Sequence, residues 1–300
     1  MEISQLEAFI AVAKTGSFSK ASDTLHLSQP AISRRIALLE HALKVSLFER
    51  IPKGIILSDS GKTFLPYAMK VMSSIKDGME ALKTDDNITS GVINIAIVGT
   101  LASTNLSKKL KAFRIKYPQV ELNLRTALSD EVSDLVLSGE VHLGMRYFPE
   151  NSLDIQANLL LKEPMVTVCA NDTALIDSNN FKIEQLKSCK FLSFAKSKKK
   201  TTNSFYQLTR KQLIKAGLDD TEQMPVDSLT AQKRLVEADF GLSLMPLSCI
   251  DEELKLGTLR ILDHPLLSTH IEIFLIHRKT LHINKVLDNF IQQMRRGSSV

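Results

Sequence analysis

Apolar residues recur at helical spacing through the first 45 positions of the chain. The first helix is predicted by apolar residues three and four positions apart, namely Leu6, Phe9, Ile10 and Ala13. Two shorter helices are predicted within residues 16–43, GSFSKASDTLHLSQPAISRRIALLEHAL, on either side of a break at His26-Leu27. Ser17 and Ser28 are suited to cap these helices, because a serine hydroxyl accepts a hydrogen bond from the first turn.

The second helix of this pair has two unlike faces. Its apolar face repeats at four, three and four residues through Ile32, Ile36, Leu39 and Leu43. The opposite face is polar near the N-terminus, and a helix of this kind fits the major groove of B-DNA. There arginine can bond guanine and glutamine can bond adenine in two places. The alternative is an ordinary helical hairpin with a solvated face. The residues predicted to contact DNA from this helix are Ser28, Gln29, Pro30, Ser33, Arg34 and Arg35, the last through phosphate.

A short hairpin is predicted directly after the helix pair. Residues 47–50 and 55–57 form two strand patterns around a proline–lysine–glycine turn. A hairpin beside a helix-turn-helix is a wing, which would place Arg50 and Lys53 against the DNA backbone. The charge supports this placement: residues 1–83 hold 11 Lys and Arg and 8 Asp and Glu, although the whole chain has a net charge of only +5.

Residues 59–83 predict one long helix. Apolar residues repeat about every 3.5 positions, at Phe64, Ala68, Val71, Ile75 and Leu82. This period predicts a coiled-coil seam between two chains, and the alternative is a helix packed on its own domain. The polar segment 84–91, TDDNITSG, predicts a hinge after the helix.

Strand and helix patterns alternate from Gly91 onward, which predicts an α/β region with a mainly parallel sheet. A first block has predicted strands at 92–99, 120–126 and 141–147, and predicted helices at 106–118 and 131–139. A second block covers roughly residues 165–265. The strand 271–278 and the helix 283–296 close the chain.

Hydroxyl-bearing residues follow several of these strands, where ligands bind in open α/β sheets. The segments are 100–103, 126–129 and 201–204, and the candidate ligand-binding residues are Thr100, Ser103, Thr126, Ser129 and Thr202. Hydroxyl groups and free backbone N–H groups at helix N-termini suit an anion. The alternative for each residue is plain helix N-capping.

Patterns for catalysis, metal binding or membrane insertion are missing from the sequence. There is no Gly-x-Ser-x-Gly, no Cys–His pair at useful spacing and no His-x-x-His cluster, so no enzyme, metal or cofactor is predicted. No apolar run approaches the roughly 20 residues of a membrane span, and no signal peptide is expected. The three separated cysteines suggest reduced thiols in a cytoplasm, with Cys189 the one modest redox candidate.

Two sets of residues carry a resemblance to a known family. The first set is Leu6, Phe9, Gly16-Ser17-Phe18, Ala21, Leu25, Ser28-Gln29-Pro30-Ala31, Ser33, Ile36, Leu39-Glu40, Leu47-Phe48-Glu49-Arg50, Leu57-Ser58, Gly61, Leu65 and Pro66. The second is Phe113, Tyr117-Pro118, Gly139, Leu160, Glu163-Pro164, Asp227-Ser228-Leu229, Val236, Gly241 and Pro246. The first set closely resembles the winged helix-turn-helix of LysR-type transcriptional regulators. The second more weakly resembles the regulatory half of the same family.

The resemblance implies a fold in three parts. These are a winged helix-turn-helix at 1–58 with its motif at about 18–37, a linker and dimerisation helix with a hinge at 59–90, and a two-lobed, periplasmic-binding-protein-like α/β domain at 91–300. Lobe I would comprise about 91–163 and 268–296, and lobe II about 164–267. A solute-binding protein is the alternative from another class, and the winged helix speaks against it.

The resemblance also implies partners. The chain would form a dimer of dimers, bind a pseudo-palindromic promoter site in double-stranded DNA and contact RNA polymerase in the cytoplasm. A small effector, for which the hydroxyl-rich segments suggest a carboxylate, would bind between the lobes and change the affinity for DNA.

Overall fold

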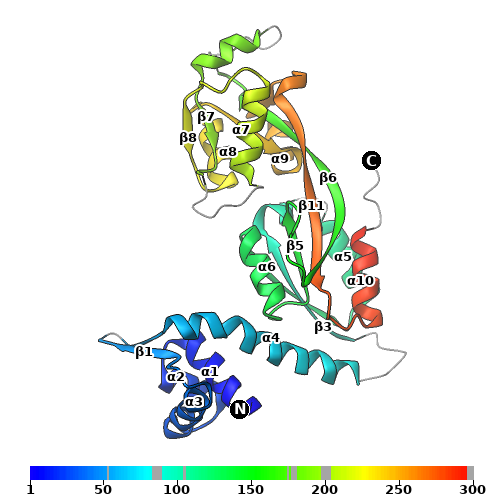
Figure 1. Ribbon diagram of the computed structural model, residues 1–300. Helices are drawn as coiled ribbons and strands as arrows, with labels where there is room; N and C mark the ends of the chain where they lie inside the picture. The colour runs from blue at the N-terminus through cyan, green and yellow to red at the C-terminus, as the bar shows by residue number, and fades with distance from the viewer. Residues whose placement is uncertain are drawn as a thin grey trace.

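The structure is a computed structural model of the 300-residue chain and describes residues 1–52, 54–82, 90–103, 106–173, 176, 181–196 and 204–295. Side chains are not described for Arg50, Glu80, Ala81, Ala102 and Ser103. The chain forms a small helical domain, a long helix beneath the middle of the molecule, and two stacked α/β lobes (Figure 1).

The N-terminal domain contains the predicted helices and hairpin. Its elements are α1 (Ile3–Thr15), α2 (Phe18–Leu25), α3 (Gln29–Leu43), β1 (Phe48–Ile51) and β2 (Gly54–Leu57). The break between α2 and α3 is a left-handed turn at His26, which has φ 54°. All three helices pack around Phe9, which is fully buried and stacks against Phe48 at a ring-centroid distance of 5.4 Å. The apolar stripes of the helices therefore form one core.

The long helix α4 (Asp59–Ala81) begins inside this core. Ala68 is 1% exposed, and Phe64 is half-buried with its ring 5.6 Å from that of Phe9. The prediction that both residues belong to an interchain seam is therefore wrong for Ala68, and Phe64 packs mainly within its own domain. Apolar spacing shows that a helix face is covered, but the same spacing serves an internal and an external partner.

The α/β region has longer crossing strands than the sequence predicted. Its strands are β3 (Gly91–Val98), β4 (Val120–Ala127), β5 (Leu143–Tyr147), β6 (Ile155–Ala170), β7 (Phe191–Ser193), β8 (Gln223–Pro225), β9 (Leu242–Pro246), β10 (Leu259–Ile261) and β11 (Ser268–Arg278). Its helices are η1 (Gly99–Ser103), α5 (Leu106–Lys116), α6 (Ser129–Leu137), η2 (Ile183–Ser188), α7 (Phe205–Lys215), α8 (Leu229–Glu237), η3 (Leu247–Cys249), α9 (Asp251–Leu256), η4 (Pro265–Leu267) and α10 (Lys285–Arg295).

Two antiparallel strands join the lobes. The strands are hydrogen-bonded in the order β4-β3-β5-β11-β6-β9-β7-β8, with β10 also on β6. β6 and β11 pair from Ile155 opposite Arg278 to Val166 opposite Ser268, and they run from one lobe into the other (Figure 1). The sequence pattern began the second block at about residue 165, whereas β6 begins at Ile155. In the structure Pro164 lies within the ladder opposite His270.

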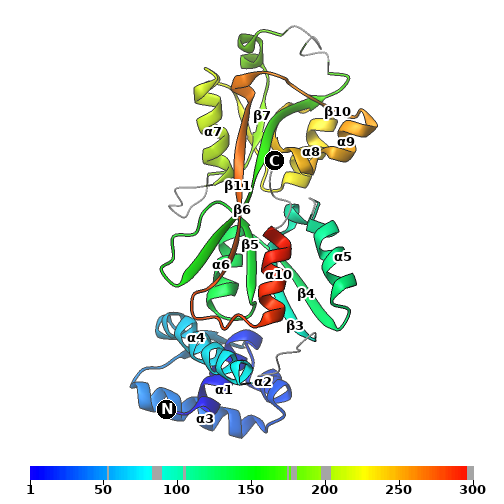
Figure 2. The same ribbon diagram turned by 90° about the vertical axis from the view of Figure 1, so that its right-hand side faces the viewer.

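Helices cover both faces of the sheet in each lobe. In lobe I, which contains β3, β4 and β5, α5 and α10 lie on one face, where Phe113 meets Phe290 at 4.9 Å (Figure 2). α6 covers the other face through Val132 and Val136. Lobe II contains β7, β8 and β9, and separate cores lie under α7 and under α8 with α9. Among the described helices none combines the length and apolar character needed to cross a bilayer.

Candidate functional site

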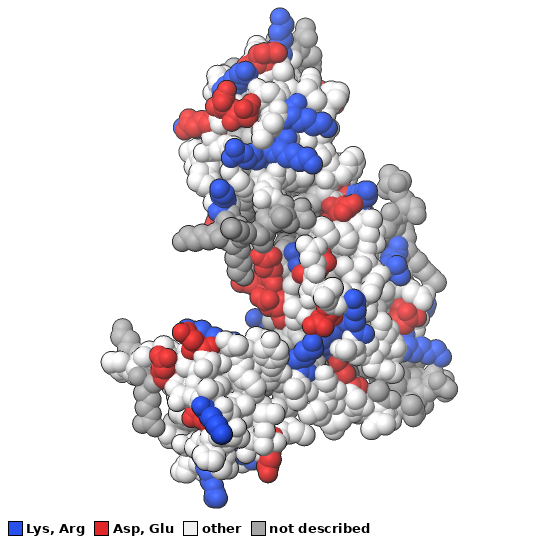
Figure 3. Space-filling view, viewed as in Figure 1, with Lys and Arg blue, Asp and Glu red and all other residues white. Residues whose placement is uncertain are grey.

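Helix α3 presents a polar face to solvent. Ile32, Ile36 and Leu39 are buried on the side of α3 that packs against α1 and α2, and this orientation leaves Gln29, Ser33, Arg34 and Pro30 exposed on the other side. The hydroxyl of Ser28 accepts a hydrogen bond from the backbone N–H of Ala31 at 3.3 Å, so this serine caps the helix. In the space-filling view, blue side chains stand out on the lower part of the N-terminal domain, where α3 lies (Figure 3).

The two adjacent arginines of α3 have different surroundings. Arg34 is exposed. Arg35 is half-buried, and its guanidinium donates to the backbone carbonyl of Ser4 at 3.5 Å. Gln29 is oriented by Ser19, whose hydroxyl donates to the side-chain oxygen of Gln29 at 3.3 Å. The Gln29 amide nitrogen and the Arg34 guanidinium are thus hydrogen-bond donors on the exposed polar face of α3.

The hairpin predicted as a wing is present beside α3. β1 and β2 are antiparallel, with Phe48 opposite Leu57 and Ile51 opposite Gly54. Arg50 lies on β1, and its side chain is outside the described part of the structure. Lys53, the other predicted backbone contact, also lies outside the described residues.

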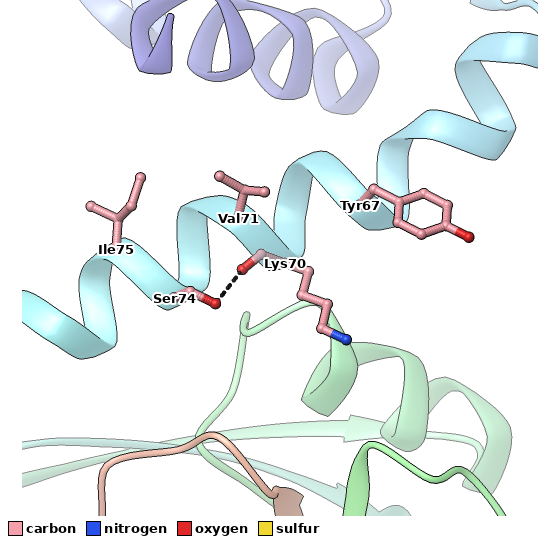
Figure 4. A pocket seen from close by; sticks show the side chains of 5 residues that line it. All are labelled: Tyr67, Lys70, Val71, Ser74 and Ile75. Carbon is pink, nitrogen blue, oxygen red and sulfur yellow. Dashed lines mark hydrogen bonds between the residues drawn. The ribbon is translucent and has the colours of Figure 1, made fainter.

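The exposed face of α4 carries apolar side chains beyond the first domain. Tyr67 is 64% exposed, Val71 is 43% exposed and Leu82 is 83% exposed. Figure 4 shows Val71 and Ile75 pointing away from Lys70, whose ammonium points toward lobe I, and the five labelled residues line an open groove along the helix. Val71, Ile75 and Leu82 therefore remain candidates for contact with a second chain.

Between the lobes, the ends of neighbouring strands bring hydroxyl groups together. β3 pairs with β4 and β5 in parallel, so the residues that follow these strands share one edge of the sheet. Thr100 follows β3, and its hydroxyl lies 3.1 Å from the phenol oxygen of Tyr147 at the end of β5. Tyr147 is fully buried, and burial raises its pKa well above the usual value, so it stays a neutral donor.

An aromatic contact bridges the two lobes beside Thr100. Phe205 is the first residue of α7 in lobe II, and its ring lies 4.9 Å from that of Tyr147 and 5.6 Å from that of Phe148 in lobe I. It also packs against Phe194 at 5.2 Å. Phe148 adopts a left-handed backbone, with φ 65°, directly after β5. Rings from both lobes therefore meet at the point where they face each other.

A buried carboxyl group completes this cluster. Glu163 on β6 is 4% exposed, and its Oε1 accepts hydrogen bonds from the backbone N–H of Ser248 at 3.1 Å and from the Ser248 hydroxyl. Its Oε2 is buried and has no hydrogen-bond partner among the described residues. Burial raises the pKa of Glu163 above its usual value.

The predicted effector-binding residues do not all meet at this cluster. Thr100 belongs to it, and Ser129 is half-buried in the first turn of α6, at the same sheet edge. Thr126 is exposed within β4, opposite Ile97, rather than in a loop after the strand. The side chain of Ser103 and all of Thr202 lie outside the described residues. The sequence did not identify four members of this cluster, namely Tyr147, Phe148, Glu163 and Phe205. The adjacent aromatic residues Tyr147 and Phe148 at the end of a predicted strand were a signal that could have found two of them.

Comparisons with known proteins match both the N-terminal and the α/β part of the chain. Residues 3–62 match the family described as bacterial regulatory helix-turn-helix protein, lysR family, and residues 87–299 match the LysR substrate binding domain. The chain is 29% identical over 297 residues to the HTH-type transcriptional regulator GltR of Bacillus subtilis, covering 98% of this chain and 96% of that one. It is 26% identical over 268 residues to the HTH-type transcriptional regulator CfxR of Cupriavidus necator, covering 88% and 81%.

A solved structure resembles the whole chain. Full-length CbnR in complex with its target DNA has a TM-score of 0.67 and 25% sequence identity, and the match covers 100% of both chains. The helix-turn-helix, the long helix and the two lobes thus occur together in a protein crystallised on DNA.

Proposed function

The chain belongs to the LysR family of bacterial regulatory helix-turn-helix proteins and regulates transcription by binding DNA, and from this premise we propose which residues do so. Gln29, Ser33 and Arg34 read base edges in the major groove, and Arg35, Arg50 and Lys53 contact phosphates. The observation that carries this proposal is the orientation of α3, whose apolar face is buried and whose polar N-terminal face is exposed.

The proposed effector is a small carboxylate bound between the lobes. Thr100 and Tyr147 form a neutral, hydrogen-bonded pair of hydroxyl groups, and Ser129 lies at the N-terminus of α6, which has partial positive charge. The contact of Phe205 with both lobes supports a ligand that changes how the lobes meet.

The proposed assembly is a dimer of dimers on a pseudo-palindromic site. The exposed apolar face of α4, with Val71, Ile75 and Leu82, supports an interchain contact there. Two chains joined in this way place two copies of α3 on one DNA duplex, and two half-sites raise the effective affinity. The protein acts in the cytoplasm, where the DNA and RNA polymerase are, and contact with the polymerase is part of the proposal.

The test of the DNA-binding surface compares two neighbouring arginines. The probe is a duplex from the region upstream of the protein's own gene, and a duplex of unrelated sequence measures non-specific binding. Arg34→Ala is expected to lower affinity for the upstream duplex by about 1–3 kcal/mol and to leave binding to the unrelated duplex nearly unchanged. Fluorescence anisotropy at fixed salt measures both affinities.

Arg35→Ala is the matched control, because it removes the same charge from the next position. It is expected to weaken both duplexes alike and to flatten the salt dependence, as loss of a phosphate contact does. If Arg34→Ala also weakens both duplexes equally, α3 does not read bases through Arg34 and the assignment fails.

A further inference from the structure

The two strands that join the lobes also touch α4 at their lobe I ends. β6 begins at Ile155, directly after Asp154, and β11 ends at Arg278. Asp154 pairs with Lys70 on α4, and Arg278 pairs with Asp77 on α4, about two turns further along the helix. Figures 1 and 2 both show α4 crossing beneath lobe I at this place.

The pair between Asp77 and Arg278 is buried and fully hydrogen-bonded. Nη2 of Arg278 lies 3.0 and 2.8 Å from the two carboxylate oxygens of Asp77. Nη1 donates to the backbone carbonyl of Val136 at 2.9 Å. The side chains are 4% exposed for Arg278 and 11% exposed for Asp77. Removing one partner of such a pair leaves the other charge buried and unpaired, so a substitution at Asp77 or Arg278 destabilises the docked position of α4.

Close backbone packing accompanies the ion pair. Gly139 follows α6 with φ +75°, and a Cβ atom there would lie 1.9 Å from the hydroxyl oxygen of Ser73 on α4. Glycine is required at this position for two reasons: the backbone is left-handed, and Ser73 of α4 lies too close for a Cβ atom. The pair between Lys70 and Asp154, at 2.9 Å, is largely exposed and contributes less.

The same helix is fixed in the DNA-binding domain at its other end. Ala68 is buried in the core around Phe9, and the second half of α4 carries Asp77. A third contact, between Lys14 of α1 and Glu140 of lobe I at 3.6 Å, joins the two domains directly. A movement of the crossing-strand ends therefore acts on a helix that is continuous with the DNA-binding core.

We propose that Asp77, Ser73, Gly139 and Arg278 form a latch that holds α4 on the lobe I ends of the crossing strands and couples the angle between the lobes to the position of the DNA-binding domain. β11 carries the coupling, because it starts in lobe II beside Val166 and ends with Arg278. Asp77 and Arg278 act as positioning residues, since neither belongs to the proposed DNA or effector contacts.

Amide hydrogen exchange of the full chain tests the latch without ligand or DNA, so its result is independent of the proposed effector. Asp77→Asn keeps the shape of the side chain and removes its charge. It is expected to speed exchange in the second half of α4 and at residues 136–141 by about tenfold or more, because both segments open locally. Exchange in α1 and β3 is expected to stay as in the wild type, which shows that the fold is intact.

Asp251→Asn is the matched control, because it makes the same change in the exposed pair between Asp251 and Lys255 on α9. It is expected to leave α4 unchanged. Arg278→Lys keeps the positive charge but cannot bond both Asp77 and the carbonyl of Val136 as the guanidinium does. Its exchange rate in α4 is expected to lie between those of the wild type and Asp77→Asn. If α4 exchanges at the wild-type rate in both Asp77→Asn and Arg278→Lys, there is no latch.

The coupling is tested by a change at the lobes. Phe205→Ala removes ring contacts between them, and it is expected to speed exchange in the second half of α4 when Asp77 is present. In a chain that already carries Asp77→Asn, the same substitution is expected to add nothing in α4. Faster exchange in lobe II with an unchanged α4 in the wild-type background would refute the coupling.

Discussion

Burial decides the chemistry of individual cysteines. Cys169 is 1% exposed and Cys189 is 2% exposed, both in the core beneath α7. Burial raises the pKa of the Cys169 thiol to about 11 and also raises that of Cys189. Cys249 is half-buried on η3, near the carbonyl of Thr100. The environment of Cys189 therefore argues against the redox role that its sequence position left open, because the thiolate is the reactive form.

The first prediction concerns these thiols. With iodoacetamide at pH 8, Cys249 is expected to be modified first, and Cys169 and Cys189 only at the rate of local opening. Peptide mass spectrometry over a time course measures each site. In urea all three thiols are expected to react at similar rates, which serves as the control. Rapid modification of Cys189 in the folded chain would restore it as a redox candidate.

At the scale of single elements, α4 shows how one helix serves three partners. One face of its first half packs into the DNA-binding core, one face of its second half docks on lobe I, and the remaining face carries exposed apolar side chains. The predicted interchain seam combined residues that face the DNA-binding core with residues on the exposed apolar face. Ala68 and Val71 lie three positions apart in the sequence, yet the first is buried and the second is 43% exposed.

The second prediction follows from the exposed face. Val71→Asp is expected to disrupt the proposed interchain contact at a cost of several kcal/mol, because a charge would be buried there, while the isolated chain stays folded. Light scattering should show a smaller particle, with weaker DNA binding at low protein concentration.

Leu256→Asp is the control, because it also places an aspartate on an exposed apolar position. Leu256 is 70% exposed at the end of α9. It is expected to leave the particle size unchanged. Ala68→Asp is expected to lower Tm instead, because Ala68 is part of the DNA-binding core. An unchanged particle size for Val71→Asp would mean that this face of α4 joins no second chain.

At the scale of the whole molecule, two regions far from the DNA-binding surface are in a position to control it. The cluster of Thr100, Tyr147 and Phe205 lies where the lobes meet, and the pair of Asp77 and Arg278 lies where lobe I meets α4. An effector changes DNA binding only if it binds two arrangements of the molecule with different affinities. The crossing strand β11 connects the two regions directly, because Ile273 pairs with Tyr147 and the strand ends at Arg278.

The third prediction belongs to the scale of the whole molecule and concerns the effector. Calorimetric titration of the full chain with a panel of small carboxylates is expected to find a ligand, and the primary amide of that ligand is expected to bind more weakly. Thr100→Val removes a hydroxyl at nearly constant shape and is expected to lower the affinity by about 1–3 kcal/mol. DNA binding without ligand is expected to stay as in the wild type.

Thr24→Val is the control for the same substitution outside the lobes, since Thr24 lies on α2 and its hydroxyl donates to the carbonyl of Lys20 in the same helix. It is expected to leave ligand affinity unchanged. Equal affinity of the wild type and Thr100→Val would place the site elsewhere. Tighter binding of the amide than of the acid would show that the ligand is not recognised as an anion.

The sequence by itself determined the local elements of this protein, and tertiary structure decided which of their faces meet. Helix periodicity, the capping serines and the hairpin pattern predicted the winged helix-turn-helix, because each depends on residues a few positions apart. The exposed face of α3 followed from the same spacing. The sequence did not predict the burial of Ala68, the contact of Tyr147 with Phe205 or the pairing of Asp77 with Arg278. Asp77 and Arg278 are 201 positions apart, and only the path of the folded chain brings such residues together.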